Sequence, residues 1–191
     1  MRVLLLPHRF PPLGRGGVET WAHNLRQGLN GLGVTVGIAT RDHRAEAEPA
    51  LPAFSVREEQ GDDGPEFWIR HRHGDARTFR DTWADPRMQR ALLKVIRAFE
   101  PDLLHVGHPD GFGVAPFRLG SRLGVPVVAT LHDPKWLCVR GQMVRPPGLL
   151  CATVDEDLCT RCVADQLGRG PFRGAAARLA PAWIAERARA R

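Results

Sequence analysis

The stretches Arg2-Val-Leu-Leu-Leu6 and Gly14-Arg-Gly-Gly-Val-Glu19 decide the fold of this chain. The first predicts a short buried strand, and the second predicts a glycine-rich loop at the start of a helix. In α/β proteins such a loop is a common place for phosphate or sugar ligands, because backbone N–H groups at the helix start point toward the ligand. Glycine also lets the main chain approach a ligand closely. The loop is therefore the first candidate binding site.

The residues after the loop predict a parallel sheet. Apolar residues recur at steps of three and four, which is typical of one face of a helix, at Val18, Trp21, Leu25, Leu29 and Leu32. Gly31 or Gly33 predicts the end of this helix, and Val34–Thr40 predicts a second strand. Strand, loop, helix and strand make one right-handed βαβ unit, which implies parallel strands.

The rest of the chain continues this alternation. Asp85-Pro86 predicts a helix start, with Asp as the N-cap and Pro in the first turn, and Pro101 predicts the end of that helix. Further strands are expected at Ala53–Val56, Phe67–Arg72, Leu103–Val106 and Val125–Leu131, and further helices at Gly113–Leu123 and Phe172–Arg191. The strand at 125–131 is apolar except for one threonine, as expected of a strand covered on both faces. The predicted fold class is α/β, a Rossmann-like doubly wound parallel sheet with a small Cys-rich insert.

Composition favours a globular protein of the cytoplasm. Hydrophobic residues make up 43% and charged residues 25% of the 191 residues, values that are ordinary for a globular protein. No apolar run approaches the roughly 20 residues that span a bilayer. The N-terminus lacks the basic region, apolar stretch and cleavage site of a signal peptide. The length fits one α/β domain with an appendage rather than two full domains.

The charge is basic and concentrated at the C-terminal end. Lys and Arg number 27 against 21 Asp and Glu, which gives a net charge of +6, and much of the excess lies beyond Arg169. A basic helix face can attract anionic lipid or nucleic acid, but a solvated face in an Arg-rich chain is the more economical interpretation. We expect at most peripheral contact with the inner face of a membrane and no nucleic acid partner.

Polar side chains follow two of the predicted strands. His132 and Asp133 come directly after 125–131, and His108 follows 103–106, while His105 lies at the end of that strand or within it. Ligands bind outside the carboxyl ends of parallel strands, so these residues would face the same crevice as the glycine loop. His132 there can donate a hydrogen bond to a substrate hydroxyl, or it can cap the strand by bonding to the backbone. Asp133 can equally mark a turn before Pro134.

Four cysteines gather in one irregular segment with the spacing C-x12-C-x7-C-x2-C: Cys138, Cys151, Cys159 and Cys162. Four thiolates can satisfy tetrahedral Zn²⁺, and the terminal C-x-x-C supplies two ligands from one turn. Unligated thiols, disulfides and an iron–sulfur cluster are the alternatives that the spacing leaves open. A metal held by four thiolates has no open position, so its function would be structural.

The loop also has a superficial likeness to the dinucleotide fingerprint G-x-G-x-x-G, with Asp42 as a possible ribose ligand. Glu19 stands where the third glycine belongs, and seven residues separate Leu6 from Gly14. Both departures disfavour an NAD-dependent oxidoreductase.

Taken together, several stretches resemble the N-terminal half of family-four glycosyltransferases: Arg2–Pro12 with Gly16–Glu19, Pro101–His105 and Val127–Asp133. The run His132–Cys138, followed by three more cysteines, is similar to a subset of this family with a Cys-rich insert. The resemblance implies a GT-B architecture, in which two Rossmann-like domains face each other across a cleft. It also implies transfer with retention of anomeric configuration and without a catalytic metal.

The resemblance further implies roles for individual residues. His132 matches the histidine that contacts the transferred sugar, and is therefore the expected catalytic residue. Gly16 and Gly17 match the glycine loop near the donor diphosphate and the acceptor, and Glu19 matches its closing acid, which we assign to the helix start. Asp133 and His108 complete the expected substrate-binding residues.

The expected organisation is a Rossmann-like core at 1–135, a Cys-rich insert at 136–170 that carries the predicted zinc ligands, and a basic helix at 171–191. In the family the nucleotide is held mainly by a C-terminal domain with a Glu-x7-Glu motif, which these residues do not contain. The chain is thus expected to end before that domain and to be inactive by itself. The predicted function is acceptor binding in a hexosyltransferase that moves sugar from a nucleotide-sugar donor to a glycan or lipid-linked acceptor. The alternative is a non-enzymatic, Rossmann-like binding module that a structural metal stabilises.

Overall fold

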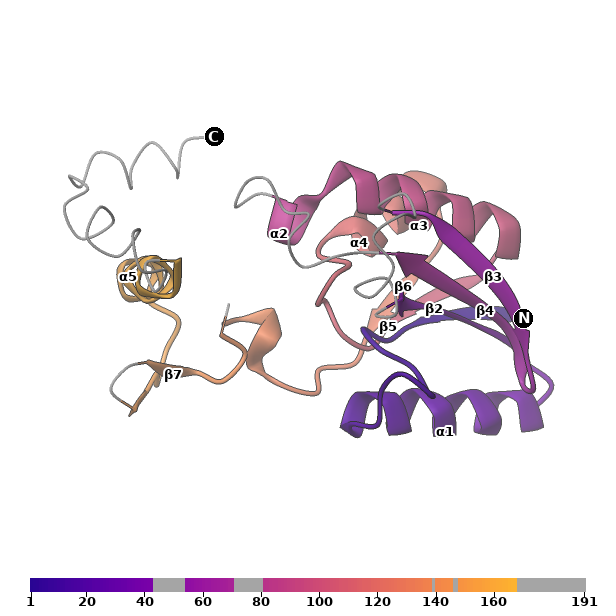
Figure 1. Cartoon of the computed structure of the whole chain (residues 1–191), viewed down its shortest axis with the longest axis horizontal. Helices are drawn as coiled ribbons and strands as arrows, with labels where there is room; N and C mark the ends of the chain where they lie inside the picture. Colours follow the sequence, from indigo (N-terminus) through magenta and orange to yellow (C-terminus); the bar gives the residue numbers. More distant parts are fainter. Residues whose placement is uncertain (43–53, 71–80, 139, 146–147, 168–191) are drawn as a thin grey trace. The chain divides into compact units, whose positions relative to one another are not determined.

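The computed structural model describes residues 1–42, 54–70, 81–138, 140–145 and 148–167. The chain divides into two compact units, Met1–His132 and Asp133–Arg191, which are described in turn (Figure 1). The helix expected at Phe172–Arg191, and with it the basic face expected to contact a membrane, lies outside the described residues. Within the described residues, no helix combines the length and the apolar composition needed to cross a bilayer.

A six-stranded sheet in the order β3-β4-β2-β1-β5-β6 forms the centre of the first unit. Its strands are β1 Arg2–Leu6, β2 Thr35–Asp42, β3 Val56–Gly61, β4 Gly64–Arg70, β5 Leu103–Val106 and β6 Val127–Ala129. Every pair of neighbours is parallel except β3 and β4, which are antiparallel. The predicted α/β, Rossmann-like fold class is confirmed.

Strand β1 lies in the interior of this sheet. Leu4 pairs with Gly37 of β2 on one side and with Leu104 of β5 on the other. The side chains of Leu4, Leu5 and Leu6 are fully buried. A strand with a helix on each face must be apolar along its whole length, which explains the unbroken leucine run.

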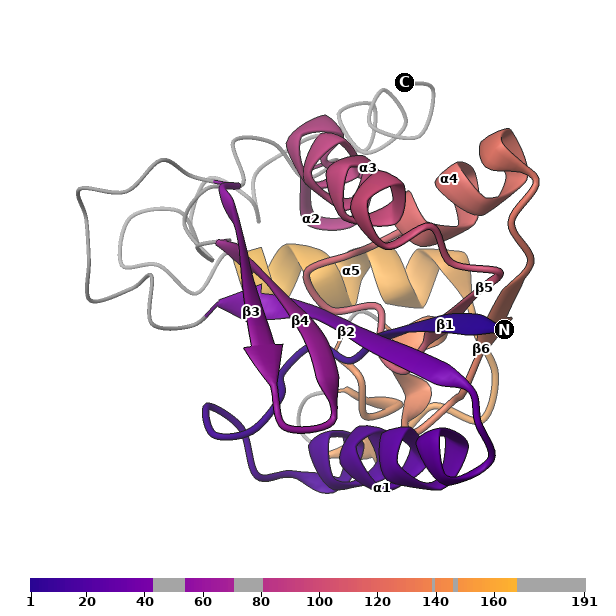
Figure 2. The same ribbon diagram turned by 90° about the vertical axis from the view of Figure 1, so that its right-hand side faces the viewer.

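Helices cover both faces of the sheet. Helix α1 (Gly17–Gly31) lies on one face, and α3 (Pro86–Phe99) and α4 (Ala115–Leu123) lie on the other (Figures 1 and 2). The short helix α2 (Asp81–Ala84) precedes α3. Right-handed crossovers produce this arrangement, because the chain first moves from β1 outward to β2 and β4, and after β4 returns past β1 to β5 and then β6.

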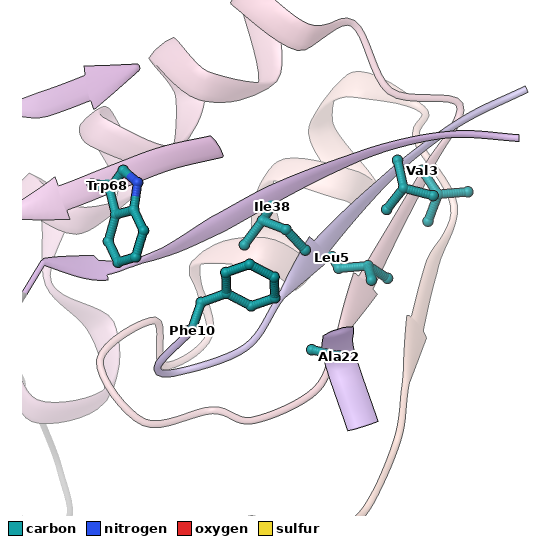
Figure 3. Packing of buried hydrophobic residues seen from close by; sticks show 7 residues of the cluster. Val3, Leu5, Phe10, Ala22, Ile38 and Trp68 are labelled. Atoms are coloured by element: carbon teal, nitrogen blue, oxygen red, sulfur yellow. The ribbon is translucent and has the colours of Figure 1, made fainter. Parts of the chain in front are cut away.

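The helix starts and the core follow the sequence pattern. Asp85 is the N-cap of α3, and its carboxylate accepts the Arg87 N–H at 2.7 Å, as the Asp-Pro pair predicts. On the α1 side of the sheet a buried cluster contains Val3, Leu5, Phe10, Ala22, Val36, Ile38 and Trp68 (Figure 3). On the other side the ring of Phe99 packs against Gly37, where an added Cβ would lie 2.8 Å from it. Gly37 therefore lets α3 approach the sheet closely.

The β3–β4 hairpin departs from the sequence prediction. The strand expected at Ala53–Val56 overlaps β3 only at Val56, since β3 begins there and runs to Gly61, and Ala53 lies outside the described residues. The strand expected at Phe67–Arg72 begins earlier, at Gly64, and the residues after Arg70 lie outside the described part of the chain. Strand β3 is an antiparallel edge strand with the polar sequence VREEQG, so it lacks the alternating pattern that marks a strand.

Strand β6 is shorter and more exposed than its sequence predicts. The strand expected over Val125–Leu131 spans Val127–Ala129, at the edge of the sheet. The expectation that both of its faces are covered is wrong, because Val128 is 46% exposed and Leu131 is 68% exposed. Apolar composition predicted burial, but the edge position of β6 leaves its side chains open to solvent.

The second unit is described over residues 133–138, 140–145 and 148–167. These residues form a 3-10 turn at Pro134–Trp136, a two-stranded antiparallel ladder of β7 (Val144–Arg145) and β8 (Leu149–Leu150), and α5 (Glu156–Leu167). None of the residues whose burial is described between positions 133 and 162 is fully buried. Among these residues there is therefore no buried apolar cluster of the kind that the first unit contains.

Candidate functional site

The strand order reverses between β1 and β5, and loops from both strands meet at the carboxyl edge of the sheet there. This switch point is where α/β proteins bind ligands. The loop after β1 leads into the N-terminus of α1, and residues after β6 reach the same edge. Two side-chain groups link these segments, one around His8 and one around Trp21.

The first group joins His8, Glu19 and His108. The ring of His8, two residues after β1, lies against the ring of His108, two residues after β5, with centroids 4.4 Å apart and the ring planes tilted by 40°. Nε2 of His8 lies 3.6 Å from Oε1 of the buried Glu19. Burial, reinforced by His108, lowers the pKa of His8 to about 4. His8 is therefore neutral at pH 7, and its contact with Glu19 is not an ion pair at that pH.

The glycine loop is shaped by Glu19. Gly16 is the N-cap of α1 and Glu19 is the third residue of the helix, and an added Cβ on Gly16 would lie 2.5 Å from Oε2 of Glu19. An added Cβ on Gly17 would meet nothing within 4 Å. Both glycines are expected site residues, but only Gly16 is required by the protein's own packing. The open space at the helix start lies at Gly17.

The second group is centred on Trp21 of α1. Its ring makes edge contacts with His132, at 4.6 Å between centroids, and with His105, at 5.1 Å. An added Cβ on Gly107 would lie 2.5 Å from the same indole ring. The ring of the exposed His132 therefore packs against Trp21, a residue of the helix that follows the glycine loop. His132 follows β6, and α1 follows the glycine loop, and the structure places the two beside each other through Trp21.

His105 is fixed within the sheet. Its Nε2 lies 2.8 Å from the Thr130 hydroxyl, across the β5–β6 pair. Burial, and secondarily His132, lower the pKa of His105 below its ordinary value. Of the two positions open to His105 from the sequence, the one within the sheet is confirmed.

The remaining predicted site residues have structural contacts of their own. His108 is buried, and its Nδ1 accepts the backbone N–H of Asp110 at 3.1 Å. Asp133 belongs to the second unit, where its carboxylate accepts the Lys135 N–H at 2.8 Å and caps the turn at Pro134–Trp136. Contact of either residue with a substrate stays a prediction.

Sequence reasoning missed three residues of this site: His8, Trp21 and Gly107. His8 carries the same signal as His132, since both follow a buried strand by a few residues. Trp21 fits the apolar stripe of α1 and was therefore assigned to the core. Gly107 has no local signal, because its need for a small side chain arises from a ring that is distant in the sequence.

An ion pair between a buried arginine and a partly exposed aspartate links β2 to the neighbouring loop. Arg41, in β2 near its carboxyl end, places its guanidinium 3.2 Å from the Asp110 carboxylate. Gly111 has a φ of +83°, and an added Cβ there would lie 2.1 Å from Cδ of Arg41. This glycine is therefore required both by its backbone conformation and by the close arginine.

The four cysteines line one cavity of about 300 Å³ in the second unit. All four are free thiols and partly buried. Burial acts to raise the pKa of Cys138, but backbone hydrogen bonds to its sulfur outweigh it and lower the pKa; they come from Gln142, Met143, Arg140 and Gly141. Among the described residues, no group of three or more His, Cys, Asp or Glu side chains is arranged so that it could hold a metal ion.

Comparison with known proteins agrees with the fold and the glycine loop. The model of Glycosyltransferase Family 4 matches residues 15–147, which run from the glycine loop through strands β2 to β6 and into the Cys-rich segment. No curated protein matches the chain. The match covers most of the 191 residues and confirms the resemblance that the motifs indicate. The chain belongs to glycosyltransferase family 4, and it corresponds to the N-terminal domain of such an enzyme.

Proposed function

We propose that this chain is the acceptor-binding domain of a retaining hexosyltransferase. The enzyme would transfer a sugar from a nucleotide-sugar donor to a hydroxyl group of a glycan or a lipid-linked glycan. Family membership supports sugar transfer in general. The observation that carries the proposal is the contact of His132 with Trp21 of α1, at 4.6 Å, because it sets an exposed imidazole beside the helix that begins at the glycine loop.

The reaction breaks the bond between the anomeric carbon and the nucleoside diphosphate and forms a bond from that carbon to the acceptor oxygen. The acceptor proton leaves with the departing diphosphate or passes to water. His132 is exposed, so its imidazole can hydrogen-bond to a hydroxyl of the transferred sugar. Backbone N–H groups at the start of α1 favour the negative charge that develops on the leaving group.

The glycine loop suits a sugar better than a dinucleotide. A pyrophosphate that approached Gly16 would meet the carboxylate of Glu19, which already occupies the space beside that residue. Asp42, the possible ribose ligand, accepts a hydrogen bond from Arg57 at 3.3 Å. Ligand access to the loop is therefore through Gly17, where space is open.

The nucleotide would be bound mainly by a second domain, as in other enzymes of this type. A lipid-linked acceptor would hold the protein at the cytoplasmic face of a membrane.

The test is sugar transfer by the protein that carries this chain, measured as release of nucleoside diphosphate from a panel of nucleotide sugars with glycan and lipid-linked acceptors. We expect His132→Ala to lower kcat/KM by about 100-fold, the usual loss when one positioned donor is removed. The matched control is His23→Ala, since His23 lies on the same helix but contacts Phe10 rather than the site. If both variants kept kcat/KM within a fewfold of wild type, the role of His132 would be wrong.

A binding measurement separates acceptor recognition from catalysis. We expect saturation-transfer NMR on the 191-residue chain to show contact with acceptor sugars. Gly17→Ala should weaken this contact, because its methyl group would enter the open space at the helix start without disturbing the protein's own packing. If Gly17→Ala left acceptor binding unchanged, the acceptor would bind at another part of the sheet edge and not at Gly17.

A further inference from the structure

The part of the second unit whose burial is described, up to Cys162, contains no fully buried residue. Several of its large apolar side chains are exposed, with Leu137 at 67%, Leu149 at 53% and Leu150 at 80%. Its only described ladder pairs two strands of two residues each. Small units with so little burial usually depend on disulfides or a bound metal. The cysteines here are free thiols, so disulfides do not supply this stability.

The four cysteines converge on one space although they come from different local structures. Cys138 follows the 3-10 turn, Cys151 follows β8, and Cys159 and Cys162 lie on α5. All four line the cavity of about 300 Å³. Cys159 and Cys162 are three positions apart on one helix and therefore share a face. The cysteines of three separate segments therefore line the same cavity.

Backbone hydrogen bonds fix Cys138 and Cys151 beside the same short segment. The Cys138 N–H donates to the Pro134 carbonyl at 2.7 Å, and the Cys138 carbonyl accepts the Gly141 N–H at 2.8 Å. Two residues further along, the Met143 carbonyl accepts the Cys151 N–H at 2.8 Å. The main chain of residues 141–143 therefore links the two cysteines, which are distant in the sequence.

We propose that these cysteines bind one Zn²⁺ ion, or a similar divalent ion that prefers tetrahedral sulfur, and that the ion holds the second unit together. The ligands are Cys138, Cys151, Cys159 and Cys162. In the structure the four side chains are not arranged around one point, so binding of the ion moves the sulfur atoms toward it. Binding also releases protons from the thiols, because the ligands are thiolates. Four protein ligands leave no open coordination position, and the ion has no part in the chemistry at His132. The proposal is independent of the proposed transferase activity.

Cobalt substitution tests the proposal on the full chain. The reduced, metal-free protein is titrated with Co²⁺, whose tetrahedral thiolate complexes show sulfur-to-metal charge transfer and intense d–d bands. We expect saturation at one ion per chain, displacement of Co²⁺ by Zn²⁺, and loss of the tetrahedral spectrum in Cys138→Ser and in Cys162→Ser. The matched control is Thr160→Ala, because Thr160 is an exposed residue of α5 whose hydroxyl bonds to a backbone carbonyl. This variant should bind Co²⁺ as the wild type does.

Thiol alkylation gives a second readout that does not depend on how well the variants fold. We expect all four cysteines to be protected from alkylation by one equivalent of Zn²⁺ and to become reactive together after chelation. Absence of a thiolate–cobalt spectrum under reducing conditions would overturn the proposal, as would an unchanged spectrum in Cys138→Ser. Purification of the chain with a disulfide or an iron–sulfur cluster at these cysteines would also overturn it.

Discussion

Gly16 and Gly17 are adjacent, yet an added methyl group would meet different surroundings at the two positions. At Gly16 it would lie 2.5 Å from the buried carboxylate of Glu19, and at Gly17 it would meet open space. We expect Gly16→Ala to lower the free energy of unfolding by about 1–3 kcal/mol, the usual cost of overpacking. Gly17→Ala should leave it unchanged or raise it by up to about 1 kcal/mol, because Ala favours a helix over Gly. Urea unfolding of both variants checks this, and an equal loss in both would contradict it.

His8 predicts how stability depends on pH. Its pKa is lowered to about 4 in the folded protein, from 6.5, so the unfolded chain binds more protons between these values. The contribution of neutral His8 to the free energy of unfolding is therefore fully present above pH 6.5 and is lost as the pH falls toward 4. The loss is at most about 3 kcal/mol, since one unit of pKa corresponds to 1.36 kcal/mol. We expect the unfolding free energy of His8→Gln to fall less steeply than that of wild type over this range, as measured by urea unfolding. Parallel curves for the two proteins would show that His8 is not responsible.

Single residues also show the limit of sequence reasoning about the site. His132 could be predicted because a polar residue after a buried strand lies at the ligand-binding edge of a parallel sheet. His8 follows the same rule but is separated from β1 by Pro7, and its significance arises from contacts with Glu19 and His108 that the sequence does not display. Trp21 illustrates the reverse case, because an apolar pattern alone does not distinguish a core residue from one that supports a site.

At the scale of elements, a buried cation ties α1 to the β3–β4 hairpin. Arg26 is 1% exposed, donates to Glu66 Oε1 at 2.8 Å, and donates to the Gly64 carbonyl at 2.6 Å. Removal of one partner from a buried pair costs about 3–5 kcal/mol, because the other charge is left without compensation. Glu66 keeps partial contact with solvent, with a side-chain exposure of 14%, so we expect the lower end of this range for Arg26→Met.

A double-mutant cycle with Glu66→Gln measures the pair itself. We expect the two changes to be less than additive in urea unfolding, because each removes the same contact. Arg26→Lys serves as the control that keeps the charge but loses the planar fork, and it should fall between wild type and Arg26→Met. If the two losses of unfolding free energy were strictly additive, Arg26 would stabilise the fold through its packing and its bonds to backbone carbonyls, and not through Glu66.

The elements that the sequence predicted well are those whose local signals agree with their tertiary surroundings. Helix α3 has an N-cap, a proline in its first turn and a continuous apolar face, and β1 is a leucine run in the middle of the sheet. Strand β3 could not be predicted, since a polar edge strand is stabilised by its partner β4 and not by its own composition. Strand β6 was predicted as a strand but not as an edge, because composition does not reveal what covers a strand.

At the scale of the whole molecule, the two compact units differ in what stabilises them. The first has a six-stranded sheet with helices on both faces and a buried apolar cluster. In the described part of the second, Leu137, Leu149 and Leu150 are exposed, and the cysteines line one cavity. The predicted division into a core at 1–135, an insert at 136–170 and a helix at 171–191 stays a prediction. The sequence could not show which apolar residues after His132 are exposed, because burial depends on which residues find partners.

This difference predicts that metal removal acts on one unit only. If a bound ion holds the second unit together, chelation under reducing conditions should increase amide hydrogen exchange in peptides from Asp133–Leu167. Peptides from β1 and β5 should keep their protection, because their stability comes from the sheet and its helices. Re-addition of Zn²⁺ should restore slow exchange in the wild type but not in Cys138→Ser. Faster exchange across both units would mean that the ion stabilises the chain as a whole, and no change in either unit would mean that the cysteines hold no structural metal.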